Sequence, residues 1–397
     1  MESNYGIKLP ESEIIESGYL ESMLLHNASS YKYFWFKAIY DEVQQGNSVI
    51  PYKRLVARMI AYAWYPVIYY KLYFGAADKL AQAVTYLHEE LHVNQDETQD
   101  NIIAMICGSD DKKLNKYIKD FLKYVPQRLL APFYQRELEY EKKRDISFHD
   151  GKVNNIIEKY NRNDQNNAFY QLDTAQAVLT VAPSWIQYLR LNAAVIEGWW
   201  NYKIIAYMQK RNPNVPAIPF KIFPPTARDR DLTVQMRYWK QIQQQAQIRD
   251  MYTDKEFSEI NLKKYGTMSL DHFIPWRFVM HNEIWNLCPT FKNVNSKKGD
   301  KLPDRERYLE KFCENQYAAF LIGKEMQGNR EITEQYLHIQ NDIFQIEKSD
   351  RGHDAFVTAM RQTLEPLYQI ANNQGYGIWW YEESKAEMPQ CSHVFMH

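Results

Sequence analysis

The chain has 397 residues, 45% hydrophobic and 24% charged, an ordinary composition for a globular protein of two or three domains. Its 48 Lys and Arg are balanced by 49 Asp and Glu, so no overall positive charge marks a nucleic-acid-binding protein, and such binding would need a local basic patch. Only 14 Gly and 16 Pro are present, few for a chain of many short strands and turns, and this favours a mainly helical fold.

No segment has the pattern of an export signal or a membrane span. The N-terminus is polar and lacks a cationic segment followed by an apolar run. The most apolar stretch, 59–70, is interrupted by Pro66 and is shorter than the ~20 residues that a membrane span needs. The four cysteines include no close pair, which excludes a CxxC zinc ribbon and argues against a disulfide framework. We therefore expect a cytoplasmic protein without membrane association.

The first half of the chain predicts helices separated by short breaks. Apolar positions are dense from residue 30 to 75, with breaks at 46–51 and near Pro66. Further helices are predicted at 77–92, 101–125, 127–147 and 170–210, and a polar loop at 148–169. Aromatic residues at 31–40 and 62–74 invite a base-stacking interpretation, but their spacing favours core packing. Three basic residues here are exposed candidates for DNA contact, namely Lys53, Arg54 and Arg58.

A proline-rich segment divides the chain. Residues 212–225 contain five prolines and cannot form one helix, so they predict a connector. A polar helix at about 226–250 follows, and helices are expected again after Pro303, to 328 and over 331–373, before an irregular tail from 375. The expected organisation is a helical N-terminal domain (1–211), the connector and its helix (212–262), a small catalytic unit (263–305) and C-terminal helices with a tail (306–397).

The segment 269–303 carries the most informative polar residues. It predicts a strand at 269–274, a loop at 276–284, a second strand at 285–290 and a short helix at 291–298. Asp271 and Asn295 offer the oxygen ligands that Mg²⁺ prefers, and two protein ligands leave positions for water and phosphate. His272 has an unperturbed pKa near ~6.5 and suits a general base. These are the needs of phosphodiester hydrolysis.

This segment resembles the HNH, or ββα-metal, nucleases. The match consists of Asp271-His272 followed by a hydrophobic pair and Pro275, Asn286 in the second strand, and Asn295 nine residues later. The resemblance implies that His272 is the general base and Asn286 holds the loop and the histidine backbone. It implies that Asp271 and Asn295 bind one Mg²⁺ or Mn²⁺. Many HNH proteins also have flanking CxxC pairs, which are absent here, so no structural zinc is expected.

The substrate and partners follow from the same resemblance. The basic residues near the motif are expected to contact DNA phosphates, namely Arg277, Lys292, Lys297 and Lys298; residues 263–311 hold 10 Lys and Arg against 6 Asp and Glu. One centre cuts one strand, so a homo-oligomer is a reasonable expectation. The resemblance to bacterial restriction and defence nucleases implies a phage-defence effector, with a sensor or activator subunit as a possible partner.

Two alternatives stay open at this point. The chain could be a helical scaffold that binds nucleic acid or a partner and whose HNH unit is inactive. It could also, remotely, be a zinc metallopeptidase, because His88, Glu89 and His92 form an HExxH pattern on a predicted helix. A third zinc ligand in a recognisable pattern is missing from the sequence, and an amphipathic helix accepts His and Glu on its polar face without a metal.

Overall fold

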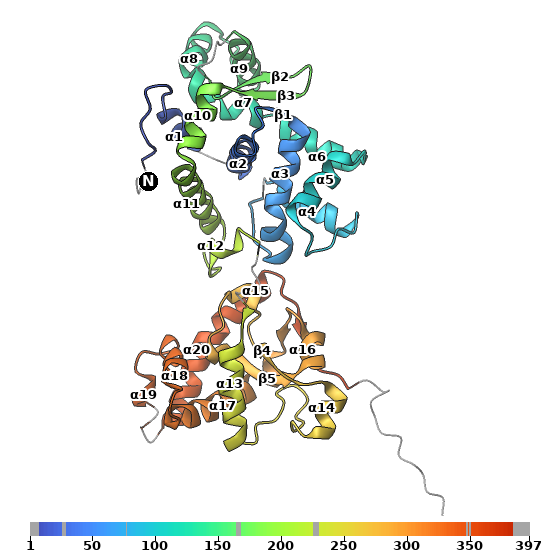
Figure 1. Cartoon of the computed structure of the whole chain (residues 1–397), viewed down its shortest axis with the longest axis vertical. Helices are drawn as coiled ribbons and strands as arrows, with labels where there is room; N and C mark the ends of the chain where they lie inside the picture. Colours follow the sequence, from blue (N-terminus) through green and yellow to red (C-terminus); the bar gives the residue numbers. More distant parts are fainter. Residues whose placement is uncertain are drawn as a thin grey trace, which may run out of the picture. The chain divides into compact units, whose positions relative to one another are not determined.

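The computed structural model describes residues 8–25, 29–76, 78–163, 168–224, 230–346, 348 and 351–383. The chain forms two compact units (Figure 1), one of residues 1–213 with 218–224 and the other of residues 214–217 with 225–397. The fold is mainly α, as predicted, with a few short strands. No helix in the described ranges is long and apolar enough to cross a membrane.

Twelve helices and three strands make up the first unit as far as it is described. The helices are α1 Gly18–Met23, α2 Tyr31–Gln44, α3 Tyr52–Trp64, α4 Leu80–Glu89, α5 Gln99–Gly108, α6 Lys112–Leu122, α7 Val125–Leu129, α8 Gln135–Arg144, α9 Val153–Arg162, α10 Pro183–Leu191, α11 Ala193–Arg211 and α12 Ile218–Lys221. The strands are β1 Val49–Pro51, β2 Tyr170–Asp173 and β3 Val178–Val181, which form an antiparallel sheet in the order β1-β3-β2.

The aromatic segments of the first unit lie in its core, as their spacing predicts. Trp35 in α2 and Trp64 in α3 are fully buried. The break expected near Pro66 is a π-helical segment, Tyr65–Tyr69, that follows α3 directly. Proline cannot donate a backbone hydrogen bond, so it interrupts the α-helical pattern. The wider π-helical turn at this point lets the chain stay helical.

Two predictions for the first unit are wrong. Residues 148–169 are predicted as a loop but contain α9, and 170–210 are predicted as helix but begin with the hairpin of β2 and β3. Burial alternates along both strands, which is the period of a half-buried sheet. Asn161 of α9 joins the two features, since its side chain donates to the Tyr170 carbonyl oxygen at 2.9 Å and accepts from the Leu172 amide at 2.8 Å.

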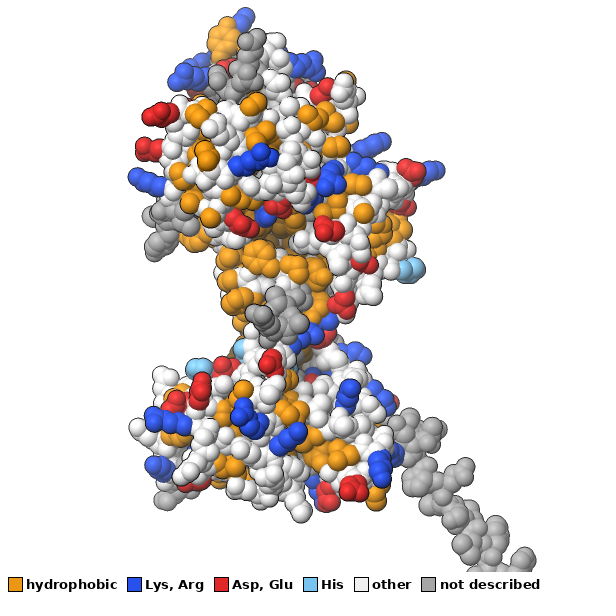
Figure 2. All heavy atoms as spheres, in the orientation of Figure 1, with side chains coloured by type: hydrophobic (Ala, Val, Ile, Leu, Met, Phe, Trp, Pro, Cys, Tyr) orange, Lys and Arg blue, Asp and Glu red, His pale blue; other side chains and the backbone are white. Residues whose placement is uncertain are grey.

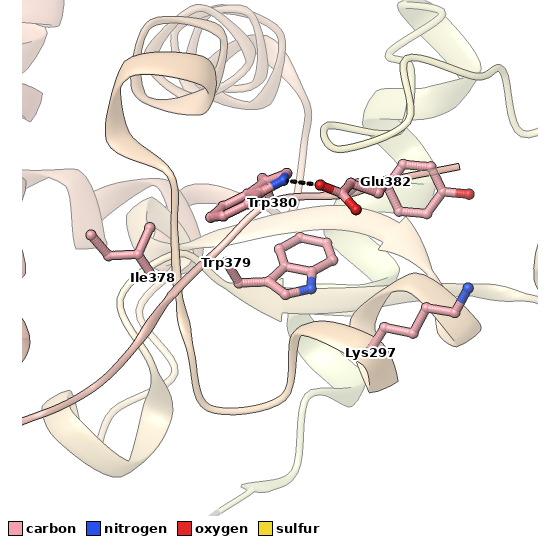
Figure 3. Close-up of a pocket in the computed structure, with 6 residues that line it drawn as sticks. Lys297, Ile378, Trp379, Trp380 and Glu382 are labelled. Atoms are coloured by element: carbon pink, nitrogen blue, oxygen red, sulfur yellow. Dashed lines mark hydrogen bonds between the residues drawn. The ribbon is translucent and has the colours of Figure 1, made fainter. Parts of the chain in front are cut away.

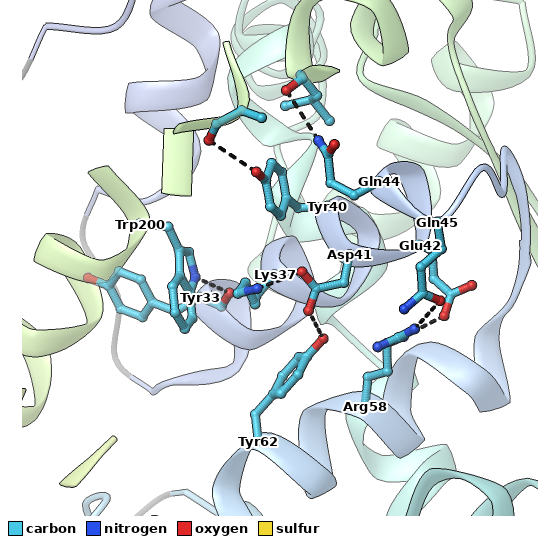
Figure 4. A network of polar contacts seen from close by, with 12 residues as sticks. Tyr33, Lys37, Tyr40, Asp41, Glu42, Gln44, Gln45, Arg58, Tyr62 and Trp200 are labelled. Atoms are coloured by element: carbon cyan, nitrogen blue, oxygen red, sulfur yellow. Dashed lines mark hydrogen bonds and ion pairs between the residues drawn. The ribbon is translucent and has the colours of Figure 1, made fainter. Parts of the chain in front are cut away.

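The three basic residues proposed for DNA contact in this unit have internal partners. Arg58 is 5% exposed and donates to the carboxylate of Glu42 (Figure 4). The same carboxylate accepts from Arg54 at 2.7 Å. Lys53 donates to the Ser109 carbonyl oxygen at 2.7 Å. Arg58 is therefore part of a buried polar network and is not an exposed phosphate contact, because α3 turns it toward α2.

The second unit surrounds a small two-stranded sheet with helices. Its helices are α13 Thr233–Gln245, α14 Glu259–Tyr265, α15 Trp276–Val279, α16 Lys292–Lys298, α17 Arg305–Glu325, α18 Arg330–Glu334, α19 Ile343–Ile346 and α20 Gly352–Asn373. Its strands are β4 Met268–His272, β5 Leu287–Phe291, β6 Leu302–Pro303 and β7 Ile378–Trp379. β4 pairs antiparallel with β5, and β6 pairs parallel with β7.

The tail expected to be irregular from residue 375 thus contributes a strand. β7 lies beside β6, which is the end of the predicted nuclease segment 269–303, so the end of the described chain packs against this segment. The helix expected at about 226–250 is shorter, running over α13, and part of its range (226–229) lies outside the described residues.

Candidate functional site

The predicted strand–strand–helix unit is present as β4, β5 and α16 (Figure 1). In the β4–β5 register, Asp271 lies opposite Cys288 and His272 opposite Leu287. All five residues of β5 are buried, so this strand lies inside the unit. α16 begins immediately after β5 and ends before Gly299, whose φ of 56° is a left-handed conformation that favours glycine. The helix therefore returns along β4 and brings its side chains to the motif residues.

Asp271 is a buried carboxylate with two strong donors. Its side chain is 4% exposed, and Lys298 Nζ lies 3.0 Å from both of its oxygens. The Tyr252 hydroxyl donates a short hydrogen bond to Oδ2. Burial raises the pKa of Asp271, and the neighbouring ammonium of Lys298 opposes this rise. The carboxylate thus faces a cation that is supplied by the chain itself.

His272 points to a different part of the unit. Its Nε2 lies 3.1 Å from the Asn282 side-chain oxygen, and its carbonyl oxygen accepts from Lys298 Nζ at 3.0 Å. Burial lowers the pKa of His272 to about 3, so the imidazole is neutral at physiological pH. Adjacent strand residues project to opposite faces, which explains why Asp271 and His272 have different side-chain partners.

Asn286 fixes the backbone just after His272. Its fully buried side chain accepts from the Ile274 amide at 2.8 Å and donates to the Ile274 carbonyl oxygen at 2.9 Å. Its own carbonyl oxygen accepts from the Phe273 amide at 2.8 Å. These three hydrogen bonds join the end of β4 to the start of β5, and they hold the segment that carries the histidine.

Asn295 lies on α16 against β4. Its amide nitrogen donates to the Leu270 carbonyl oxygen at 2.9 Å and lies 3.3 Å from the Ser269 hydroxyl. A carbonyl oxygen can only accept, so the nitrogen must be the atom that faces β4. The side-chain oxygen then points away from the strand, where it can serve as a ligand. Lys298, three residues later on the same helix, contacts the next strand residue, Asp271.

Two side chains of the unit offer oxygen atoms of the kind that a hard divalent cation prefers. Asp271 and Asn295 supply oxygen atoms, and the side-chain nitrogen of Asn295 is already used by the strand. A carboxylate has about four lone-pair sites, and Lys298 and Tyr252 take three on Asp271. Oδ1 has one of these contacts and Oδ2 has two, so Oδ1 is the oxygen that would hold a cation.

The four basic residues predicted near the motif have different environments. Lys292 and Lys297 are exposed. Arg277 pairs with Asp300 at 2.9 Å, and its side chain is only 13% exposed. Lys298 is buried against Asp271, so it does not present its charge at the surface as an ordinary phosphate contact would. Lys and Arg are interspersed with Asp and Glu on the face in view in Figure 2.

Two residues of the site have no signal in the motif. Tyr252 precedes Asp271 by 19 residues and reaches it because Asp250 accepts from the amides of Tyr252 at 3.1 Å and Phe291 at 2.9 Å. Asn282 lies in the loop between the strands, where a polar residue is ordinary. Only long-range contacts in the folded chain reveal either role.

The HExxH pattern does not form a zinc-binding helix. α4 ends at Glu89, and His92 lies beyond it with a φ of 54°, so His88 and His92 do not share a helical face. His88 Nδ1 instead contacts the Val93 carbonyl oxygen at 2.8 Å. No cluster of three His, Cys, Asp or Glu suited to a metal occurs among the described residues. The helix predicted at 77–92 is too short to carry the peptidase motif.

Comparison with known proteins places this unit in a family. The HNH endonuclease family matches residues 250–304, a range that includes Tyr252. The chain is also similar to the CRISPR-associated endonuclease Cas9 of Listeria innocua serovar 6a, with 28% identity over 166 residues, 32% of this chain and 12% of the Listeria protein. The chain therefore spans only a small part of that relative's length. No solved structure matches. Residues 250–304 are therefore identified as an HNH endonuclease domain.

Proposed function

We propose that this protein is an endonuclease that hydrolyses DNA phosphodiester bonds with one Mg²⁺ or Mn²⁺. The observation that carries the proposal is the placement of His272 at the end of β4, with Asn286 holding the next turn and Asn295 facing the same strand from α16. A neutral histidine, a buried carboxylate and an amide oxygen in one small unit match the chemistry of the family.

His272 is the general base of this proposal. Asn282 donates through its side-chain nitrogen to the Asp231 carbonyl oxygen at 3.3 Å, so its side-chain oxygen faces His272 and accepts from Nε2. In this proposal the ring proton is on Nε2, and Nδ1 is the nitrogen that takes a proton from water. Because burial lowers the pKa of His272 to about 3, this lone pair stays available down to acidic pH.

Asp271 and Asn295 would hold the divalent cation. When bound, it stabilises the negative charge that develops on the phosphate and on the leaving oxygen. Tyr252 and Lys298 orient the Asp271 carboxylate before any ligand arrives, and Asn286 keeps the β4 end and the histidine in register. Exposed Lys292 and Lys297 would attract the phosphates of the strand.

Assembly and biological role are further parts of the proposal. One centre cuts one strand, so cleavage of both strands calls for a second copy, which a homo-oligomer would supply. A sensor or activator subunit would instead control when the nuclease acts. The similarity to a protein named as a CRISPR-associated endonuclease supports a role in defence against phage. The helical first unit would then serve recognition or assembly.

One observation favours a second candidate function. Lys298 already places a positive charge on Asp271, which is the carboxylate that the cation needs. If this pair persists in solution and excludes the metal, the protein is a helical nucleic-acid- or partner-binding scaffold with an inactive HNH unit. It would then bind without cutting, and binding would not depend on His272.

Metal dependence separates the two candidates. Supercoiled plasmid is incubated with the full chain in Mg²⁺, Mn²⁺ or EDTA, and Mn²⁺ binding is measured by titration calorimetry. We expect nicking and Mn²⁺ binding that both weaken in Asn295→Ala, and no such loss in the control Asn293→Ala, an exposed asparagine on the same helix. Absence of both nicking and Mn²⁺ binding in the wild type would support the scaffold.

A further inference from the structure

A cleft lined by aromatic side chains lies beside α16. It has a volume of about 300 Å³ and is lined by Lys297, Ile378, Trp379, Trp380, Tyr381 and Glu382 (Figure 3). Three consecutive aromatic residues thus share one cleft with a lysine of the nuclease unit. None of the aromatic three belongs to the HNH motif, and none has a role in the chemistry described above.

The cleft is held firmly by the strand pair β6 and β7. The Leu302 amide donates to the Gly377 carbonyl oxygen at 2.8 Å, and the Asp304 amide donates to the Trp379 carbonyl oxygen at 2.7 Å. The Tyr381 amide donates to the Tyr308 hydroxyl at 3.0 Å. The aromatic segment is therefore fixed, before any ligand binds, to β6 at the end of the motif segment and to α17, which comes next in the chain.

Trp380 presents an indole to solvent in a fixed orientation. It is 41% exposed, and it is the one exposed tryptophan in the parts of the chain that the structure describes. Its indole nitrogen donates to Glu382 at 2.7 Å, and the Arg307 guanidinium lies 5.6 Å from its ring centroid. An exposed indole keeps a large apolar surface in contact with water, which is unfavourable. An indole that two partners also hold in one orientation is therefore suited to bind a planar group.

The charges around the cleft suit a nucleotide better than a free anion. Lys297 lies 5.9 Å from the Tyr381 ring centroid and Arg307 lies near Trp380, so phosphates flanking a base would find two cations. Glu382 would repel an isolated phosphate, but its carboxylate can accept hydrogen bonds from the amino groups of a base. A nucleotide therefore offers a partner to each charge: its phosphates to the two cations, and the amino groups of its base to Glu382.

Such a base must be unpaired. In a duplex, both faces of each base are covered by its neighbours, so an indole can stack only on a base in a single strand or one that has left the helix. The cleft is also close to the proposed reaction centre. The Trp379 ring lies 5.1 Å from the ring of Tyr252, whose hydroxyl contacts Asp271, and Lys297 adjoins Lys298.

We propose that this cleft binds one unpaired base of the substrate strand, stacked on Trp380, with Lys297 and Arg307 on the adjoining phosphates. The proposal rests on the proposed nuclease function and narrows its substrate to DNA that is single-stranded or locally opened near the cut.

Binding tests this without requiring cleavage. Fluorescence anisotropy measures the dissociation constant of a labelled single-stranded DNA for the full chain carrying His272→Ala, in EDTA, alongside a duplex and a single-stranded RNA of the same sequence. Trp380→Ala should weaken single-strand binding by about 5- to 150-fold, the range for loss of one stacked base. Trp380→Phe, which keeps a flat ring, should recover most of the affinity. Duplex affinity should change little.

A matched control comes from the first unit. Tyr140 is 53% exposed, and the Arg144 guanidinium lies 5.1 Å from its ring, so Tyr140→Ala removes a similar exposed aromatic residue far along the sequence. The proposal is overturned if Trp380→Ala binds the single-stranded DNA as tightly as its parent, or if Tyr140→Ala loses as much affinity. If the protein still nicks plasmid in a His272-dependent way, the proposed nuclease function stands even though the cleft proposal has failed. The two failures are therefore distinguishable.

Discussion

Lys298 Nζ lies 3.0 Å from both carboxylate oxygens of Asp271, and the lysine side chain is fully buried. The pair joins the last turn of α16 to β4, so it holds this helix on the strand that carries His272. Charges removed from water in this way are costly unless both partners are present. The pair therefore stabilises the folded unit and also controls access to the Asp271 carboxylate.

Replacing Lys298 by methionine should destabilise the protein. The change leaves the Asp271 carboxylate buried without its cation, and breaking such a pair costs about 3–5 kcal/mol in free energy of unfolding. Urea unfolding measures the loss. The exposed neighbour provides the control, since Lys297→Met should change stability by less than about 0.5 kcal/mol. Equal effects of the two substitutions would contradict the buried pair.

Asn286→Ala should loosen the turn after β4. It removes both partners of the Ile274 backbone, and each buried polar group left unpaired costs about 1–3 kcal/mol. Chemical denaturation should show this loss, and cleavage should fall with it because the histidine segment is no longer held. The exposed Asn293→Ala serves as comparison. Unchanged stability in Asn286→Ala would mean that other contacts hold this turn.

Asn282→Ala should slow cleavage more than it lowers stability. The substitution removes the oxygen that accepts from His272 Nε2, so the imidazole loses its orientation and preferred tautomer. A general base contributes a rate enhancement of ~100- to 10,000-fold. Loss of its orientation should therefore lower the single-turnover rate by about tenfold or more. Asn282→Asp retains an acceptor oxygen and should lose less. A wild-type rate in Asn282→Ala would argue against this role.

Acidification should destabilise the protein through His281. Burial lowers the pKa of His281 to about 4, and its Nδ1 accepts from the Glu283 amide at 3.3 Å, a bond that protonation breaks. As the pH falls, His281 of the unfolded chain is therefore protonated at a higher pH than His281 of the folded chain. Stability is full above pH ~6.5 and falls toward pH ~4, by at most about 1.4 kcal/mol per pH unit for this group. Thermal unfolding of His281→Gln should show a weaker pH dependence; an identical profile would reject this assignment.

The ββα unit could be predicted from sequence because its signals are local. The strands, the short helix and the spacing from Asp271 to Asn295 all lie within residues 268–298, and each element follows from its own residues. The helical character of the first unit also follows from apolar spacing. The hairpin of β2 and β3 was missed because four-residue strands in a long apolar stretch resemble helix.

Contacts between distant residues explain what the sequence could not predict. Tyr252 reaches Asp271 only through the fold. Lys297 and Lys298 are indistinguishable in sequence, but one helical step separates them by about 100°, so one faces solvent and the other faces β4. The aromatic cleft depends in the same way on the pairing of β6 with β7, two short strands about 75 residues apart.

The central claim is that His272 performs metal-dependent strand cleavage. The most direct test is a time course of supercoiled-plasmid nicking in Mn²⁺ by the wild type, His272→Ala and the matched control His281→Gln, each confirmed as folded by circular dichroism. We expect His272→Ala to be slower than the wild type by at least ~100-fold and His281→Gln to retain most of the rate. Nicking by His272→Ala at the wild-type rate, or none by the wild type, would contradict the claim.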